Sequence, residues 1–324
     1  HISLLEEALK KSKKKFKLVQ FKDNVSINSN FARIGKGSLG GKARGLAFLN
    51  ENIYKKNIIK KFPSINLRVP KTAVVSTDEF DNFMEKNDLW KIALEANNNK
   101  IITKQFLKAR LSKEVIKLLK SFLKTIDTPL AVRSSGLLED SQYQPLAGMY
   151  STFMLPNSSN SEKERLSQVC ESIKRIYAST FFKEPKTLLS QFVQKHEEEK
   201  MAIIIMELIG KNHDNTFYPT FSGVCQSYNY YPVSHMDRKD GVAFLALGLG
   251  KTVADGEKSL RYSPKYPEIL PQYYSVKSAI NNSQNKFYAL DLKNEKELLY
   301  KGEEGNLNKY DLEVAEGHNE LKHI

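Results

Sequence analysis

The most constraining feature of the chain is an arginine that lies between a short apolar run and a glycine-containing loop. Apolar residues at 130–132 lead into Arg133, Ser134 and Ser135, and a loop with the sequence AGMYST follows at 147–152. A guanidinium presents a rigid fork of N–H donors that matches phosphate oxygens. Glycine lets backbone N–H groups approach an anion closely, and hydroxyls add neutral donors. The pattern predicts a strand that feeds a phosphate-binding loop, although a plain strand–turn–strand with an exposed arginine also explains it.

A second segment, at 34–49, reads IGKGSLGGKARGLAFL and has four glycines within seven residues. The apolar residues that follow have helical spacing, so the segment predicts a loop that opens a helix over 41–56. Free N–H groups and the dipole at a helix N-terminus favour an anion. Gly41 and Lys42 lie in the expected first turn, where the lysine provides a point charge for phosphate.

Three common nucleotide-binding motifs are excluded. Residues 35–40 match the dinucleotide fingerprint by letter, but lysines replace the acidic residue required about twenty positions later. The P-loop pattern fails because position 36 is lysine and Ala43 replaces the hydroxyl residue that would hold magnesium. The V-A-I-K, H-R-D and D-F-G motifs of protein kinases do not occur in the sequence.

Composition is that of a globular protein with a sizeable core. The chain has 324 residues, of which 40% are hydrophobic and 27% are charged. No apolar run approaches the ~18 residues that span a membrane, so we expect no membrane partner. The sequence begins with His1 and has no signal-like segment, and we expect a fragment of a longer protein. Cys170 and Cys225 are far apart, which indicates reduced thiols in the cytoplasm.

The net charge of +13 indicates an anionic partner, whether nucleic acid, an acidic membrane surface, a small anion or an acidic domain. The densest lysine cluster, at 10–17, lies on a predicted helix and is typical of a solvated face. No nucleic-acid module and no interleaved aromatic pattern are present, so we do not expect nucleic acid as the partner.

The order of predicted elements favours an α+β fold with two lobes, because helices cluster early and strands cluster late. We expect a basic appendage at 1–30, a first lobe at 31–200 and a second lobe at 201–324. Predicted helices lie near 41–56, from 77 onward, and near 104–109, 112–125, 161–178 and 186–195. Predicted strands lie at 69–76, 130–135, 151–155, 201–209, 217–228, 241–249 and 287–290, the last being the final strand.

Several short motifs match one protein family in their order and spacing. They are GGKA at 40–43, VP at 69–70, AVRSS at 131–135 followed by Glu139-Asp140, AG at 147–148, Thr152-Phe153, SGV at 222–224 and GLG at 248–250. Together they resemble the N-terminal nucleotide-binding domain of the phosphoenolpyruvate synthase and pyruvate phosphate dikinase family. The resemblance covers roughly residues 31–270.

The resemblance implies an ATP-grasp fold with ATP and Mg²⁺ in a cleft between two lobes. It implies catalytic roles for Lys42, Arg133 and Thr152. The other implied nucleotide contacts are Gly41, Ser134, Ser135, the lid residues Gly148, Met149 and Ser151, the adenine-hinge residues Met206, Glu207, Leu208 and Ile209, and Arg261. In the family, this domain transfers a phosphoryl group from ATP to a histidine on a separate domain, which carries it to pyruvate.

The chain departs from the family pattern in two ways. Lys251 stands where the family has a glutamate, and a lysine cannot bind magnesium, so Asp255 and Glu257 are the candidate replacement ligands. Glu139 and Asp140 are also available as ligands, although a role in capping or bracing the loop explains them equally. None of the six histidines has the sequence context of the phosphorylated histidine. The resemblance therefore implies that the phosphohistidine domain and the pyruvate/phosphoenolpyruvate-binding domain are partners within the full-length protein.

Four functional interpretations follow. The first is the ATP-binding domain of a phosphotransferase of the phosphoenolpyruvate synthase or pyruvate phosphate dikinase type. The second uses the same domain on another acceptor, such as a glucan or an antibiotic hydroxyl. The third is a degenerate nucleotide-sensing module, suggested by Lys251. The fourth is an anion- or nucleic-acid-binding protein driven by the net charge. We favour the first.

Overall fold

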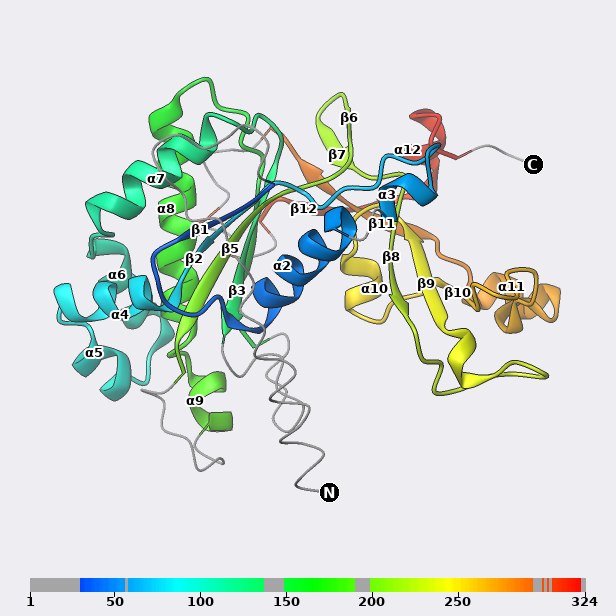
Figure 1. The fold of residues 1–324 in the computed structure, drawn as a ribbon, viewed down its shortest axis with the longest axis horizontal. Helices are drawn as coiled ribbons and strands as arrows, with labels where there is room; N and C mark the ends of the chain where they lie inside the picture. The colour runs from blue at the N-terminus through cyan, green and yellow to red at the C-terminus, as the bar shows by residue number, and fades with distance from the viewer. Residues whose placement is uncertain are drawn as a thin grey trace. The chain divides into compact units, whose positions relative to one another are not determined.

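The computed structural model describes residues 30–55, 58–136, 149–189, 199–293, 299, 302 and 305–321 (Figure 1). The chain divides into two compact units, His1–Glu207 and Leu208–Ile324. Each unit contains both helices and sheets, so the α+β expectation is confirmed. Nearly all of the expected appendage at 1–30 lies outside the described residues.

The first unit is built on a five-stranded sheet in the order β1-β2-β5-β3-β4. The strands are β1 (Phe31–Ile34), β2 (Thr72–Val75), β5 (Met201–Glu207), β3 (Leu130–Gly136) and β4 (Thr152–Leu155). β1 and β2 are parallel, whereas β5 is antiparallel to both of its neighbours, β2 and β3. Consequently β1, β2 and β3 all run in one direction.

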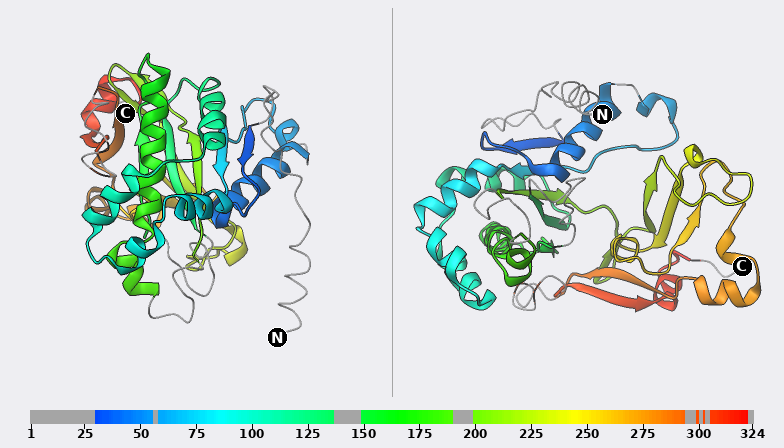
Figure 2. Two further views of the ribbon diagram at one scale, coloured as in Figure 1. Left: turned by 90° about the vertical axis from the view of Figure 1, so that its left-hand side faces the viewer. Right: turned by 90° about the horizontal axis from the view of Figure 1, so that it is seen from below.

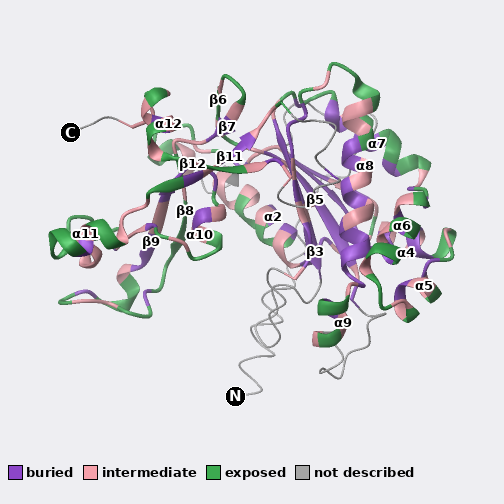
Figure 3. Ribbon diagram, turned by 180° about the vertical axis from the view of Figure 1, so that it is seen from behind, coloured by how far each residue is buried: buried purple, intermediate pink, exposed green. Residues whose placement is uncertain are grey.

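Helices cover both faces of this sheet, so its central strands are buried (Figure 3), and their sequences are almost continuously apolar. α2 (Gly40–Lys55) lies on one side, and α8 (Glu162–Ser179) lies on the other. The further helices are α3 (Ile58–Lys61), α4 (Thr77–Lys86), α5 (Trp90–Glu95), α6 (Asn99–Lys108), α7 (Lys113–Leu123) and α9 (Lys183–Leu189). Buried aromatic rings of α4, α6 and α8 contact one another, with Phe83 packed on Phe106 and on Tyr177.

The second unit contains two antiparallel sheets. One has the order β10 (Leu260–Tyr262), β9 (Val242–Leu247) and β8 (Phe221–Gln226). The other has the order β12 (Leu307–Asp311), β11 (Lys286–Asp291), β7 (Thr216–Tyr218) and β6 (Lys211–His213). Gln284 connects the two sheets, because its side-chain amide pairs with both the N–H (2.8 Å) and the carbonyl (3.1 Å) of Leu247.

Three short α-helices complete the described part of the second unit, namely α10 (Lys251–Ala254), α11 (Val276–Asn282) and α12 (Leu312–Gly317). Figure 2 shows the same elements from two further sides. No helix among the described residues is long and apolar enough to cross a membrane.

Most of the predicted elements of the first unit are present near the expected positions. The main difference concerns the strand expected at 201–209, which ends at Glu207 and pairs with β2 and β3 in the sheet of the first unit. The structure therefore puts the division after Glu207, whereas we had assigned this strand to the second lobe. The strand expected to be final, β11, is followed by β12. Helix α9 ends at Leu189, and the rest of the helix predicted at 186–195 lies outside the described residues.

A stacked histidine pair joins the segment after α12 to the β6–β7 hairpin. The rings of His213 and His318 are 4.7 Å apart and nearly parallel, and the Tyr218 hydroxyl hydrogen-bonds His318 Nδ1 at 2.8 Å. Glu320 accepts a hydrogen bond from Lys211 at 2.8 Å and lies 3.6 Å from His213 Nε2. Burial lowers the pKa of His213, and the positive charge on His318 and Lys211 lowers it further, against the opposing effect of Glu320.

We predict that the second unit loses stability as the pH falls through about 6.5, the ordinary pKa of histidine. The folded-state pKa of His213 lies below that value, so the unfolded chain binds the extra proton more readily. His213→Phe keeps a ring for stacking but removes the titration, and it should flatten the pH dependence of the thermal unfolding midpoint. Glu320, whose pKa the Lys211 hydrogen bond lowers, loses its contribution only at more acidic pH.

Circular dichroism across this pH range measures the effect. His235→Phe is the matched control, because His235 is an exposed histidine of the same unit and its replacement should leave the slope unchanged. An unaltered slope in His213→Phe would contradict the prediction.

Candidate functional site

The candidate site lies at one edge of the sheet of the first unit, where three of its strands end. β1, β2 and β3 run in the same direction, so their carboxyl ends lie at this edge together with the beginnings of β4 and β5. The glycine loop follows β1, and α4 follows β2 almost immediately. Segments that are about a hundred residues apart in the sequence are thereby brought together, as the two phosphate-type motifs require.

The strand register places several predicted residues on one face of the sheet. Arg133 lies opposite Thr152 in β4 and opposite Ile204 in β5. Residues directly opposite one another share a face, and so do residues two apart along a strand. Ser135 and Met206 therefore also lie on the face of Arg133. Helix α2 packs on this same face, because Ala43 and Ala47 form a buried cluster with Val74 and Ile204, and Met206 packs against it.

Ser135 fastens the glycine loop to this face. Its hydroxyl donates to the Leu39 carbonyl at 2.8 Å and accepts from the Ala43 N–H at 3.1 Å. Gly40 lies between these two partners with a φ of +72°, and a Cβ there would lie 1.8 Å from the Ser135 carbonyl oxygen. The fully buried Ser135 thus positions the loop and the first turn of α2, where Gly41 and Lys42 lie, rather than offering its hydroxyl to a ligand.

A second anchor comes from the start of α4. The Asp78 carboxylate accepts from the Lys36 N–H at 2.8 Å and from the Ser76 hydroxyl, and Thr77 exchanges hydrogen bonds with Ser38. Burial raises the pKa of Asp78, but the hydrogen bonds from Ser76 and from the backbone of Lys36 outweigh it, so the pKa is lowered. The carboxylate therefore stays charged and holds the glycine loop across the neutral pH range.

Arg133 has an unused donor beside this anchored loop. Its Nε is buried and has no hydrogen-bond partner among the residues that the structure describes. Buried polar groups are normally paired, and a partly desolvated cation without a counter-charge is costly. Since Thr152 lies directly opposite in β4 and Ser135 is on the same face, the guanidinium is suited to receive an anion at this position.

Other predicted residues of the first unit have structural partners. Ser134 is fully buried and, by alternation along β3, lies on the opposite face from Arg133 and Ser135. Ser151 is buried, and its N–H donates to the Ser179 hydroxyl of α8 at 3.2 Å. Met149 falls within the described residues, whereas Gly148 lies outside them. Ser134 and Ser135, which we expected to act as neighbouring donors, therefore lie on opposite faces of the sheet.

The expected adenine-hinge residues are divided as well. Met206 and Glu207 end β5 in the first unit, whereas Leu208 and Ile209 belong to the second. Glu207 accepts from Arg68 Nη1 at 2.9 Å and from the Lys71 N–H at 3.2 Å, so its carboxylate holds the segment that precedes β2.

In the second unit, Arg261 is engaged in holding a loop. Its Nη2 donates to the Tyr231 carbonyl at 2.7 Å and to Asn229 Oδ1 at 3.1 Å. The backbone N–H of Arg261 donates to the Gln272 side chain at 2.7 Å. These contacts connect β10 to the segment after β8, which gives Arg261 a structural role whether or not it also contacts phosphate.

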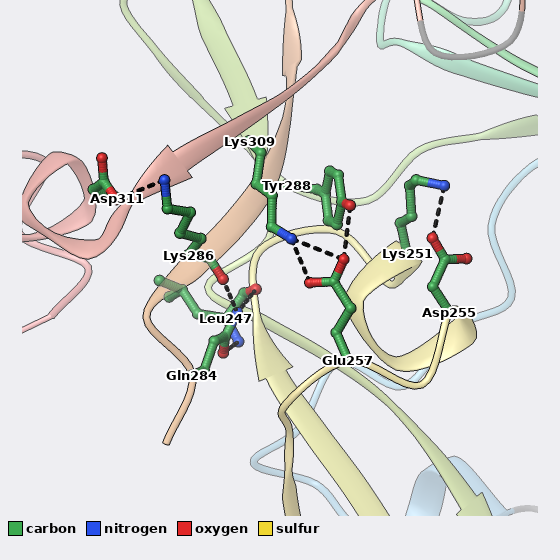
Figure 4. Close-up of polar contacts among 9 residues, drawn as sticks. All are labelled: Leu247, Lys251, Asp255, Glu257, Gln284, Lys286, Tyr288, Lys309 and Asp311. Atoms are coloured by element: carbon green, nitrogen blue, oxygen red, sulfur yellow. Dashed lines mark hydrogen bonds and ion pairs between the residues drawn. The ribbon is translucent and has the colours of Figure 1, made fainter. Parts of the chain in front are cut away.

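The two candidate metal ligands do not form a cation site. Asp255 pairs with Lys251 at 2.8 Å, while both oxygens of Glu257 accept from Lys309, at 2.8 and 2.7 Å (Figure 4). The Tyr288 hydroxyl also donates to Glu257, at 2.8 Å. Within the described ranges, no three His, Cys, Asp or Glu residues are grouped so that they could hold a metal ion. Asp255 and Glu257, each paired with a lysine, therefore do not fit Mg²⁺ in this arrangement.

The role of Asp78 is not predicted by the sequence. Thr77 and the acidic residues after it predict the start of a helix, and α4 does begin at Thr77. The same residues also bind the glycine loop through Lys36 and Ser38. The polar residues at the start of this helix could have indicated a contact with the glycine-rich segment. Helix capping alone also explains them.

Comparison with protein families gives one match. The model of the family described as "Pyruvate phosphate dikinase, AMP/ATP-binding domain" matches residues 36–317. The chain therefore belongs to this family, as the resemblance predicted. No curated protein matches the chain.

We predict opposite effects from two glycine-to-alanine changes that flank the start of α2. Gly40→Ala forces a Cβ against the Ser135 carbonyl at a positive φ and should lower the free energy of unfolding by about 2–4 kcal/mol. Gly45→Ala is the matched control, because Gly45 lies within α2 and a Cβ there would have no neighbouring atom within 4 Å. This change should raise the free energy of unfolding by about 1 kcal/mol. Urea unfolding measures both. Equal effects of the two changes would refute the anchored-loop geometry.

Proposed function

We propose that the carboxyl edge of the first unit's sheet binds the phosphates of ATP. The observation that carries the proposal is the unpaired Nε of Arg133, which lies on the face where Ser135 anchors the glycine loop. Membership of a family of AMP/ATP-binding domains supports a nucleotide as the anion. Arg133 and Lys42 would neutralise the phosphate charge, while the positive end of the dipole at the start of α2 would favour the phosphate oxygens.

The proposed reaction transfers a phosphoryl group from ATP to a histidine on a separate domain. Such a transfer requires positioning of the nucleotide and neutralisation of the charge that develops on the oxygens. Arg133 and Lys42 would supply the positive charge, and the Thr152 hydroxyl, opposite Arg133, would add a neutral donor. The acceptor histidine and the pyruvate/phosphoenolpyruvate-binding domain would be provided by the full-length protein, in the cytoplasm.

From family membership alone, we further propose an ATP-grasp arrangement in which the two units hold the nucleotide between them. Met206, on the face of Arg133, would then offer an apolar contact to the adenine ring. We expect Mg²⁺ to arrive bound to the phosphate oxygens of ATP, as is usual for this small and strongly hydrated ion. No role in the reaction is given to Asp255 or Glu257, since lysines neutralise both carboxylates.

The same lysine pairing favours a second candidate function, a module that senses ATP without transferring a phosphoryl group. The two candidates make different predictions for the full-length protein incubated with ATP labelled in its phosphates. Acid-labile label on a histidine would support transfer, while ATP binding without any labelling would support sensing. Glucan and antibiotic hydroxyls are alternative acceptors for the first candidate, distinguished by label on that acceptor.

We predict that Arg133→Ala weakens ATP binding by at least about tenfold, because a charge-assisted hydrogen bond contributes about 1.5–3 kcal/mol. Lys42→Ala should act in the same direction. Arg110→Ala is the matched control, since it removes the same charge from an exposed position between α6 and α7 and should leave affinity unchanged. Isothermal titration calorimetry with ATP measures all three, and far-UV circular dichroism confirms folding. Parental affinity in both Arg133→Ala and Lys42→Ala would remove the proposed site.

A further inference from the structure

A compact charged cluster surrounds the ring of Tyr288 in the second unit. The ammonium groups of Lys251, at the start of α10, and Lys309, in β12, lie 5.6 and 5.1 Å from the ring centroid. Both distances fall within the range of a cation–π interaction. The Tyr288 hydroxyl donates to Glu257, and the four side chains together with Asp255 form one continuous group (Figure 4).

Among the described residues, the charges in this cluster balance. Each ammonium is paired with one carboxylate, since Lys251 contacts Asp255 and Lys309 contacts both oxygens of Glu257. The hydrogen bonds that Lys309 donates to Glu257 lower the pKa of the Glu257 carboxyl and raise the pKa of the Lys309 ammonium. Both partners therefore stay charged near neutral pH, and the cluster carries no surplus negative charge that would attract a divalent cation.

A divalent cation would have to displace an ammonium group from a carboxylate before it could be coordinated. At Glu257 this displacement costs two hydrogen bonds from Lys309 and leaves that ammonium with the Tyr288 ring alone among the contacts described above. It would also weaken the connection between β12 and the segment that follows α10. Displacing Lys309 from Glu257 would therefore destabilise the fold of the second unit as well as the charged cluster.

We propose that Lys251 and Lys309 take the place of a protein-bound divalent cation beside Asp255 and Glu257, so that this protein holds no metal ion through these carboxylates. The part of the inference that concerns nucleotide binding rests on the proposed function. The part that concerns metal binding stands on the cluster itself. The competing arrangement makes a different prediction. Bound phosphates would attract Lys251 and Lys309 away from their carboxylates, and Asp255 and Glu257 would then coordinate the metal.

Titration with Mn²⁺, followed by electron paramagnetic resonance on the chain without nucleotide, tests the metal part directly. We expect the parent protein to have no site tighter than about 1 mM that depends on Asp255 or Glu257. Lys309→Met frees Glu257 and should strengthen Mn²⁺ binding by at least about tenfold.

Lys286→Met is the matched control. Lys286 of β11 pairs with Asp311 of β12 at 3.3 Å, outside the cluster, so this variant should not bind Mn²⁺ more tightly than the parent. A parental site tighter than about 1 mM that Glu257→Gln abolishes would overturn the proposal. The parental titration decides even if Lys309→Met fails to fold.

Calorimetry with ATP, in Mg²⁺ and in chelator, tests the nucleotide part. Glu257→Gln and Asp255→Asn should leave the ratio of the two affinities unchanged, whereas loss of the Mg²⁺ response in either variant would overturn the inference. If the parent binds no ATP under either condition, the proposed function fails, and the Mn²⁺ titration still decides whether the lysines exclude the metal. The two failures are therefore distinguishable.

Discussion

The hydroxyl of Ser135 is the contact on which the architecture of the candidate site depends. It joins the carbonyl of Leu39 to the N–H of Ala43, and so fixes the end of the glycine loop and the first turn of α2 onto β3. Arg133 precedes Ser135 by two positions on the same strand and lies on the same face. One strand therefore sets both the position of the loop and the position of the cation that we propose to bind phosphate.

The cation of the candidate site differs from the cations of the second unit that we predicted or found near phosphate-type positions. In the first unit, Arg133 keeps a buried nitrogen without a partner in the described part of the chain. In the second, Lys251, Lys309 and Arg261 are each paired with an acceptor of their own unit. The contrast supports our proposal that phosphate binds in the first unit, and it is consistent with a structural role for the charged cluster around Tyr288. The net charge of +13 by itself makes no such distinction.

Local features were predictable from the sequence, whereas long-range pairing was not. The helices at 40–55 and 77–86 and the strand at 130–136 follow from spacing, glycines and polar starts within each segment. The split roles of Ser134 and Ser135 depend on which face α2 covers, which the alternation of one strand does not reveal. The run at 201–209 is apolar on both faces, so its sequence does not indicate which of the two units contains this strand. The pairing of Glu257 with Lys309 joins positions far apart in sequence.

Hydrogen–deuterium exchange with and without ATP is the most direct test of the central claim, that the loop anchored by Ser135 binds the phosphates. We predict that ATP slows exchange in peptides that cover residues 36–43, because a phosphate bound at the start of α2 would stabilise the anchored loop against local opening. Peptides from the exposed α11 should be unaffected and serve as the internal reference. ATP binding that leaves residues 36–43 unchanged, with protection elsewhere, would contradict the account.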